Sequence, residues 1–149
     1  MNDPSSENAP LKILLAEDCA ADRFWLEMVL KSARIDYTLT TLTDGESARN
    51  YLQQHTSQHP DGPDLVFLDQ NLPKLTAMEI LQELPDVKAL PYCVITGSAT
   101  EKEQWVKEFS LLPPCYILKP LTQAKLVQCL RAYHSLRLVA DAIEESVGH

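Results

Sequence analysis

Short apolar runs alternate with longer amphipathic segments along most of this chain. The apolar runs read as five strands, at residues 12–16, 37–43, 64–69, 91–96 and 115–118. Four of the five are continuous rather than alternating, which is typical of parallel strands covered on both faces. Helical patterns follow the strands, at residues 20–34, 46–54, 77–84, 100–110 and from 121 onward. This order predicts a doubly wound α/β domain with a five-stranded parallel sheet, for which we expect the strand order 2-1-3-4-5.

The pattern divides the chain into three segments. Residues 1–10 are polar and contain two prolines, so we expect a disordered tail, then one domain over 11–134 and a helical extension over 135–149. No proline or glycine occurs from 122 to 147, so the last helix is expected to run on. Apolar residues recur in it at spacings of three and four: Leu130, Tyr133, Leu136, Ala140, Ile143 and Val147. Because this stripe outlasts the expected edge of the domain, we favour a homodimer contact through the C-terminal helix over a tail folded back on the same domain.

The composition excludes several classes of function. The 149 residues suit one domain, and a formal charge of −8 disfavours binding to nucleic acid or to an anionic membrane surface. No apolar run approaches transmembrane length and the first ten residues do not resemble a signal peptide, so we expect a cytoplasmic location. The cysteines form no CxxC pair and are expected to be small buried thiols in a reducing compartment rather than disulfide partners: Cys19, Cys93, Cys115 and Cys129.

Polar residues stand at the ends of four predicted strands, and ligands of doubly wound sheets bind at the carboxyl ends of the strands. Glu17 and Asp18 follow the first strand, and Asp69 ends the third. Thr96 ends the fourth strand and Lys119 follows the fifth. Taken singly, such residues are usually turn formers or helix caps. Taken together, three carboxylates, one hydroxyl and one lysine are expected to meet at one edge of the sheet.

Such a cluster has a specific chemistry. Carboxylates packed together raise one another's pKa unless a cation compensates, and Mg²⁺ is the common hard cation with oxygen ligands. A carboxylate beside Mg²⁺ and a lysine can act as a nucleophile towards a phosphoryl group, because the two cations neutralise the phosphoryl oxygens. We therefore expect a site that forms an aspartyl phosphate, with Mg²⁺ as its cofactor.

Four stretches resemble the motifs of response-regulator receiver domains: LLAEDCAADR, LVFLDQNLPK, VITGSA and YILKP. The resemblance covers about residues 11–134 and implies the flavodoxin-like receiver fold. It implies that Asp69 is the phosphoacceptor. Asp18, Asp69 and the backbone carbonyl of Asn71 would bind Mg²⁺ directly. Glu17 would act mainly through bound water.

The same resemblance assigns roles to residues around the acceptor. Thr96 would bind a phosphoryl oxygen and move on activation. Lys119 would pair with the phosphoryl group, and the peptide bond that follows it is expected to be cis. Tyr116 would be the switch residue whose ring turns inward when Thr96 moves, although a half-buried strand aromatic without that role is the simpler alternative. Gly97 would leave access to the acceptor.

One position departs from the family pattern. An Asp-Gly pair usually lies seven and eight residues after the acceptor, and Thr76 and Ala77 occupy those places here. Glycine permits a backbone shape that alanine tolerates poorly, so we expect altered geometry in the loop after the third strand. This departure is the sequence support for an alternative function, a pseudo-receiver that binds partners without phosphorylation.

The resemblance implies a signalling protein rather than an enzyme. With no output domain visible in the sequence, we expect a single-domain response regulator of a bacterial two-component phosphorelay. A sensor histidine kinase would donate the phosphoryl group. The polar insertion at 55–63, residues 71–74 and the helical C-terminus resemble regulators that serve phytochrome kinases. The signal would leave by altered contacts with a downstream protein, at the face formed by 100–110, 115–118 and the final helix.

A Mg²⁺-dependent phosphohydrolase with an aspartate nucleophile is the enzyme alternative. That class needs a second aspartate two residues after the nucleophile as its acid and base. Asn71 occupies that position, so the sequence disfavours the enzyme.

Overall fold

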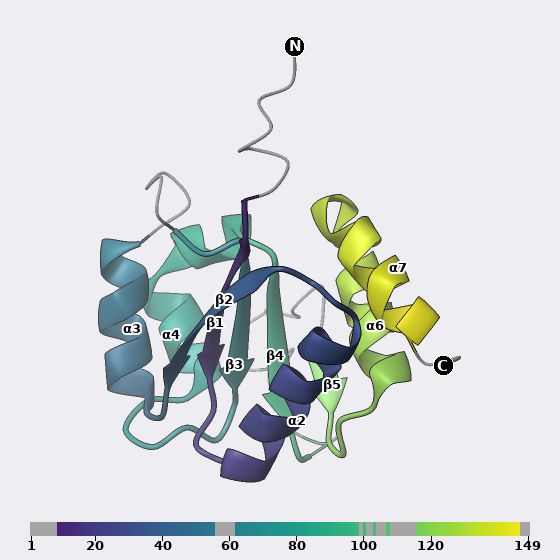
Figure 1. Ribbon diagram of the computed structural model, residues 1–149. Helices are drawn as coiled ribbons and strands as arrows, with labels where there is room; N and C mark the ends of the chain where they lie inside the picture. The colour runs from purple at the N-terminus through teal and green to yellow at the C-terminus, as the bar shows by residue number, and fades with distance from the viewer. Residues whose placement is uncertain are drawn as a thin grey trace.

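The computed structural model describes residues 9–55, 62–98, 100, 103, 107 and 116–146. Its five parallel strands form one sheet in the order β2-β1-β3-β4-β5 (Figure 1). The strands are β1 (Leu11–Ala16), β2 (Tyr37–Leu42), β3 (Leu65–Asp69), β4 (Tyr92–Thr96) and β5 (Tyr116–Leu118). The predicted fold class and strand order are confirmed. Most of the predicted tail at 1–10, the insertion at 55–63 and the helix at 100–110 lie outside the described residues.

Helices cover both faces of this sheet. They are α2 (Ala20–Ser32), α3 (Gly45–Gln54), α4 (Ala77–Glu83), α6 (Gln123–Arg131) and α7 (Arg137–Ser146), with short 3₁₀ helices η1 (Pro85–Ala89) and η2 (His134–Leu136). In Figure 1, α2, α6 and α7 lie on one side of the sheet, and α3 and α4 lie on the other.

Two apolar cores result, one on each face. Ile13 and Leu15 of β1 face the core under α2, α6 and α7. Leu14 and Ala16 face the core under α3, α4 and η1. This alternation along a strand that is apolar at every position explains the continuous apolar runs of the sequence.

The start of β3 is fixed to β1 by one residue. The backbone N–H of Asp64 donates to the carbonyl of Lys12 at 2.7 Å. In return, the carboxylate of Asp64 accepts from the backbone N–H of Lys12 at 2.9 Å. These two bonds set the register at the amino end of β3, the end opposite the predicted site.

The loop after β3 ends in a regular helix cap. The side chain of Thr76 accepts from the backbone N–H of Glu79, and the Glu79 carboxylate accepts from the backbone N–H of Thr76, which is a capping box. Ala77 is then the first residue of α4 and is fully buried. The positive φ angle of this loop falls on Lys74, at 74°. Thr76 and Ala77 therefore replace the family's Asp-Gly pair without strained backbone at either position.

The same loop packs closely on α3. The backbone N–H of Gly45 donates to the carbonyl of Pro73 at 2.8 Å. A Cβ atom at Gly45 would lie 2.0 Å from the carbonyl oxygen of Leu75. Only glycine allows this approach, so Gly45 holds the loop that begins at the acceptor strand.

The C-terminal segment is broken rather than continuous. The predicted helix from 122 to 147 ends at Arg131, and Tyr133 takes an extended conformation before η2 and α7. The hydroxyl of Tyr133 donates to the backbone carbonyl of Tyr92 at 2.5 Å. Arg131 forms ion pairs with Asp141 and Glu144, which join α6 to α7. The turn needs no glycine or proline, so the sequence pattern missed it.

This turn folds the apolar stripe back onto the domain. Leu136, Ala140 and Ile143 are each 1% exposed or less and pack in the core with α2 and α6. The uncovered stripe on which the homodimer expectation rested is therefore absent from the described residues, and the alternative of a tail folded back on the same domain holds. Val147 lies outside the described residues.

The cysteines differ in their oxidation state. Cys19 and Cys93 are free thiols; Cys93 is buried as expected, whereas Cys19 is only partly buried. Cys129 is in a disulfide bond, so the expectation of thiols throughout is wrong for this residue; Cys115 lies outside the described residues.

No helix within the described ranges is long and apolar enough to cross a bilayer.

Candidate phosphoacceptor site

The register of the sheet brings the predicted polar residues to one edge. Ala16 pairs with Leu68, and Asp69 pairs with Ile95, so β1, β3 and β4 end nearly level. The backbone N–H of Lys119 donates to the carbonyl of Thr96 at 2.8 Å. The chain beyond β5 is thereby held beside the end of β4.

Three carboxylates meet at this edge. Oxygen atoms of Glu17, Asp18 and Asp69 all lie within 4.8 Å of one another. Glu17 and Asp69 are 1% and 3% exposed, while Asp18 faces solvent. Cys19 is the N-cap residue of α2 and makes no side-chain cap bond, so Asp18 lies before the helix and is not its cap.

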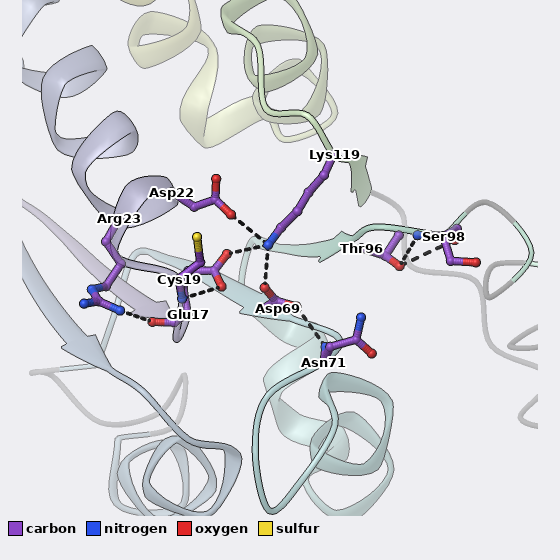
Figure 2. A network of polar contacts seen from close by, with 9 residues as sticks. All are labelled: Glu17, Cys19, Asp22, Arg23, Asp69, Asn71, Thr96, Ser98 and Lys119. Atoms are coloured by element: carbon purple, nitrogen blue, oxygen red, sulfur yellow. Dashed lines mark hydrogen bonds and ion pairs between the residues drawn. The ribbon is translucent and has the colours of Figure 1, made fainter.

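The ammonium group of Lys119 lies among carboxylates, as Figure 2 shows. Its Nζ atom contacts three of them: Asp22 Oδ2 at 2.7 Å, Asp69 Oδ2 at 2.9 Å and Glu17 Oε1 at 3.3 Å. Burial opposes the charged form, but the hydrogen bonds to Asp22 and Asp69 outweigh it and raise the pKa of Lys119. The lysine is therefore a fixed positive charge at the acceptor.

Glu17 and Asp69 titrate as a pair. Burial raises the pKa of Glu17 to about 8, and a hydrogen bond to Asp69 and its negative charge add to the effect. Burial alone would raise the pKa of Asp69, but hydrogen bonds from Glu17, the Asn71 amide and Lys119 lower it. In the metal-free protein the proton therefore resides on Glu17, and Asp69 is the ionised partner.

The donor set fits a hard divalent cation. The Oε1 atom of Glu17 is buried and makes no hydrogen bond among the described residues; its ion pair with Lys119, at 3.3 Å, is the longest of the lysine's three carboxylate contacts. One ammonium shared by three carboxylates leaves negative charge in the cluster, which a proton or a second cation can compensate. The three carboxylates can hold a divalent metal, because Mg²⁺ and Mn²⁺ take oxygen ligands and Asp18 leaves one side open to water.

The remaining predicted residues lie around the cluster. The backbone N–H of Asn71 donates to Asp69 Oδ1 at 2.8 Å, so that residue is beside the acceptor. Thr96 is fully buried, and its hydroxyl accepts from the backbone N–H of Ser98 at 3.2 Å. Tyr116 is half-buried at the start of β5 and packs against the core under α3 and α4. The Lys119–Pro120 peptide bond is cis, as expected.

Two site residues were missed by the sequence analysis, and both lie on α2. Asp22 binds Lys119, and Arg23 donates from its guanidinium to the backbone carbonyl of Glu17 at 2.9 Å. The available signal was helical spacing. Asp22 is in the first turn of the helix that begins two residues after Asp18, so its side chain starts close to the site.

A parallel sheet of order 2-1-3-4-5 with carboxylates and a lysine at its carboxyl edge defines a receiver domain. The chain belongs to the response regulator receiver domain family, whose family model matches residues 13–131.

Two response regulators show the closeness of this relationship. The chain is 36% identical to response regulator Rcp1 of Synechocystis sp. over 142 residues, covering 93% of this chain and 95% of Rcp1. The crystal structure of Mn²⁺-bound Rcp1 has a TM-score of 0.64 at 35% identity, covering 80% of this chain and 89% of that one. The phosphorylated cyanobacterial phytochrome response regulator RcpA has a TM-score of 0.66 at 30% identity, covering 87% and 95%.

Proposed function

We propose that Asp69 accepts a phosphoryl group from a histidine kinase while Mg²⁺ is held by the acidic cluster. The observation that carries the proposal is the environment of the Asp69 carboxylate. It is buried at a strand end, lies 2.9 Å from the Lys119 ammonium and shares a cation-binding cluster with Glu17 and Asp18. A buried carboxylate that stays ionised beside a fixed positive charge is suited to nucleophilic attack on phosphorus.

The bonds that form and break in the transfer involve only the Asp69 carboxylate and the phosphohistidine of the donor. A carboxylate oxygen of Asp69 bonds to phosphorus, the P–N bond to the donor's imidazole breaks, and its electron pair stays with the imidazole. Asp18, Asp69 and the Asn71 carbonyl would hold Mg²⁺ directly and Glu17 mainly through bound water, and the cation would supply positive charge to the phosphoryl oxygens. Lys119 supplies a second positive charge. The product is an acyl phosphate on the protein itself, so the site does not turn over an external substrate.

The proposed output is a change of protein contacts. The phosphoryl group adds a charge of about −1.5 to −2 at the sheet edge. Thr96, at the end of β4, is the proposed phosphoryl ligand. Tyr116, one strand away, is the proposed residue that reports the shift of Thr96 to a downstream protein.

The proposed donor is a sensor kinase of the phytochrome type. This proposal rests on similarity to RcpA, a cyanobacterial phytochrome response regulator. The test is to mix this chain with a phytochrome kinase that carries a radiolabelled phosphoryl group on its histidine. The label is expected to move from the kinase to this chain, and an unrelated sensor kinase is expected to transfer its label much more slowly.

The test of the acceptor is the intact mass after incubation with acetyl phosphate, with and without Mg²⁺. One labile adduct that needs Mg²⁺ and is lost in Asp69→Asn is expected. Asp86→Asn, the same change at an exposed aspartate of η1, is the matched control and should keep the adduct. If the folded protein gains no adduct from acetyl phosphate or from a kinase, phosphorylation-independent binding becomes the better account.

A further inference from the structure

Asp22 makes the shortest of the carboxylate contacts to Lys119. Its Oδ2 atom lies 2.7 Å from Nζ, against 2.9 Å for Asp69 and 3.3 Å for Glu17. Asp22 extends from the first turn of α2 and reaches the ammonium from a different side than Asp69 (Figure 2). It is not among the carboxylates of the acidic cluster.

The cluster and Asp22 hold Lys119 in different ways. A divalent cation bound by Glu17, Asp18 and Asp69 shares their negative charge, which weakens the attraction of Glu17 and Asp69 for the ammonium. Asp22 lies outside the cluster, so its charge is not shared with the cation. The share of the electrostatic attraction on Lys119 that comes from Asp22 therefore increases when the cation binds.

Lys119 needs such a hold because its side chain is long and 27% exposed. A lysine on a four-carbon stem has several rotamers, and only some of them place Nζ beside the acceptor. The Asp22 carboxylate is itself only 24% exposed and is carried by a helix, so it presents a fixed partner.

We propose that Asp22 is a positioning residue that keeps the Lys119 ammonium beside Asp69 once the cation is bound. The inference rests on the proposed phosphoacceptor function and deepens it. Asp22 acts through Lys119, because it contacts the ammonium and is not a member of the acidic cluster. A surface ion pair without this role would contribute little and would leave the phosphorylation rate unchanged.

The test compares Asp22→Asn with Glu27→Gln. Both variants remove one negative charge from α2, but Glu27 lies more than one turn beyond Asp22. At saturating Mg²⁺, Asp22→Asn should slow phosphorylation by acetyl phosphate about tenfold. Glu27→Gln should keep the parent rate, and Asp22→Glu should recover part of it. An unchanged or faster Asp22→Asn would overturn the proposal.

A double-mutant cycle separates this role from a structural one. In a Lys119→Ala background, Asp22→Asn should have no further effect on the phosphorylation rate. If it slows that background as much as it slows the parent, Asp22 does not act through Lys119 and the proposal is wrong.

A second measurement does not depend on phosphorylation. In Mg²⁺-loaded protein labelled with ¹⁵N, the Lys119 ammonium should give a slowly exchanging NMR signal, identified by its loss in Lys119→Ala. The signal should persist in Glu27→Gln and disappear in Asp22→Asn. Its persistence in Asp22→Asn would refute the proposal. If the signal is lost in Asp22→Asn but the parent protein takes up no phosphoryl group, Asp22 still positions Lys119 and only the proposed phosphoacceptor function is wrong.

Discussion

The carbonyl oxygen of Leu75 lies where a side chain on Gly45 would begin, 2.0 Å from the position of its Cβ atom. The loop that follows the acceptor strand is thus seated on the first turn of α3. Gly45 also donates its N–H to this loop, at the carbonyl of Pro73. Any side chain at Gly45 would have to displace backbone atoms of Leu75, which cannot move aside as the end of a flexible side chain can.

Gly45→Ala is therefore expected to destabilise the protein by about 1–3 kcal/mol, measured by urea unfolding. At a position with compatible backbone and free space, Gly→Ala stabilises a protein by about 0.4–1 kcal/mol, so the sign of the change tests the contact. Gly97→Ala is the control, because a Cβ atom there meets nothing within 4 Å. Equal stability of the two variants would contradict the close packing at Gly45.

The raised pKa of Glu17 predicts a pH dependence of stability. For the metal-free protein, the contribution of this group is complete below its ordinary pKa of 4.5 and is lost as the pH rises through about 8. The urea midpoint should therefore fall as the pH rises from about 4.5 to about 8 and stay level at higher pH. The lowered pKa of Asp69 has the opposite sign and acts only in acid, as the pH falls below its ordinary value of 3.8.

Mg²⁺ should reverse this dependence. The cation binds the ionised form of Glu17, so its affinity should rise over the same pH interval and its binding should release protons near neutral pH. Calorimetric titration in buffers of different ionisation enthalpy counts the protons. Glu17→Gln should flatten both the stability profile and the proton release; a profile as steep as the parent's would assign the titration to another group.

The covered stripe of α7 predicts the effect of Ile143→Ala. Ile143 is fully buried within its own domain, so the cavity should lower the free energy of unfolding by about 2–5 kcal/mol. Leu138→Ala, on the same helix at a side chain that is 80% exposed, should change it by less than about 0.5 kcal/mol. The loss at Ile143 should not vary with protein concentration. A loss that grows on dilution would point to a dimer contact instead.

The sequence predicted the sheet and the acidic edge because both depend on strand ends. Continuous apolar runs mark buried parallel strands, and the residue after each run must lie at the carboxyl edge. Glu17, Asp69 and Lys119 could be placed together on that basis. Their mutual distances could not, since side-chain contacts depend on register and rotamers.

The features that the sequence missed lie on helices and in turns. Asp22 reads as an ordinary acid in the first turn of a helix, and only the folded chain shows that it reaches Lys119. The break at Tyr133 is stabilised by a long-range bond to the carbonyl of Tyr92, which no local pattern reveals. Thr76 departs from the family's Asp-Gly pair, and its capping box with Glu79 is the sequence pattern that explains the regular start of α4.

The paired bonds between Asp64 and Lys12 have a consequence for how this chain can change in evolution. They restart the register at the amino end of β3, whatever the length of the segment that leads into it. Residues inserted or deleted between α3 and β3 therefore need not displace Asp69 at the far end of the strand. The polar segment at 55–63 is thus a place where lineages can acquire new sequence while the acceptor carboxylate keeps its position.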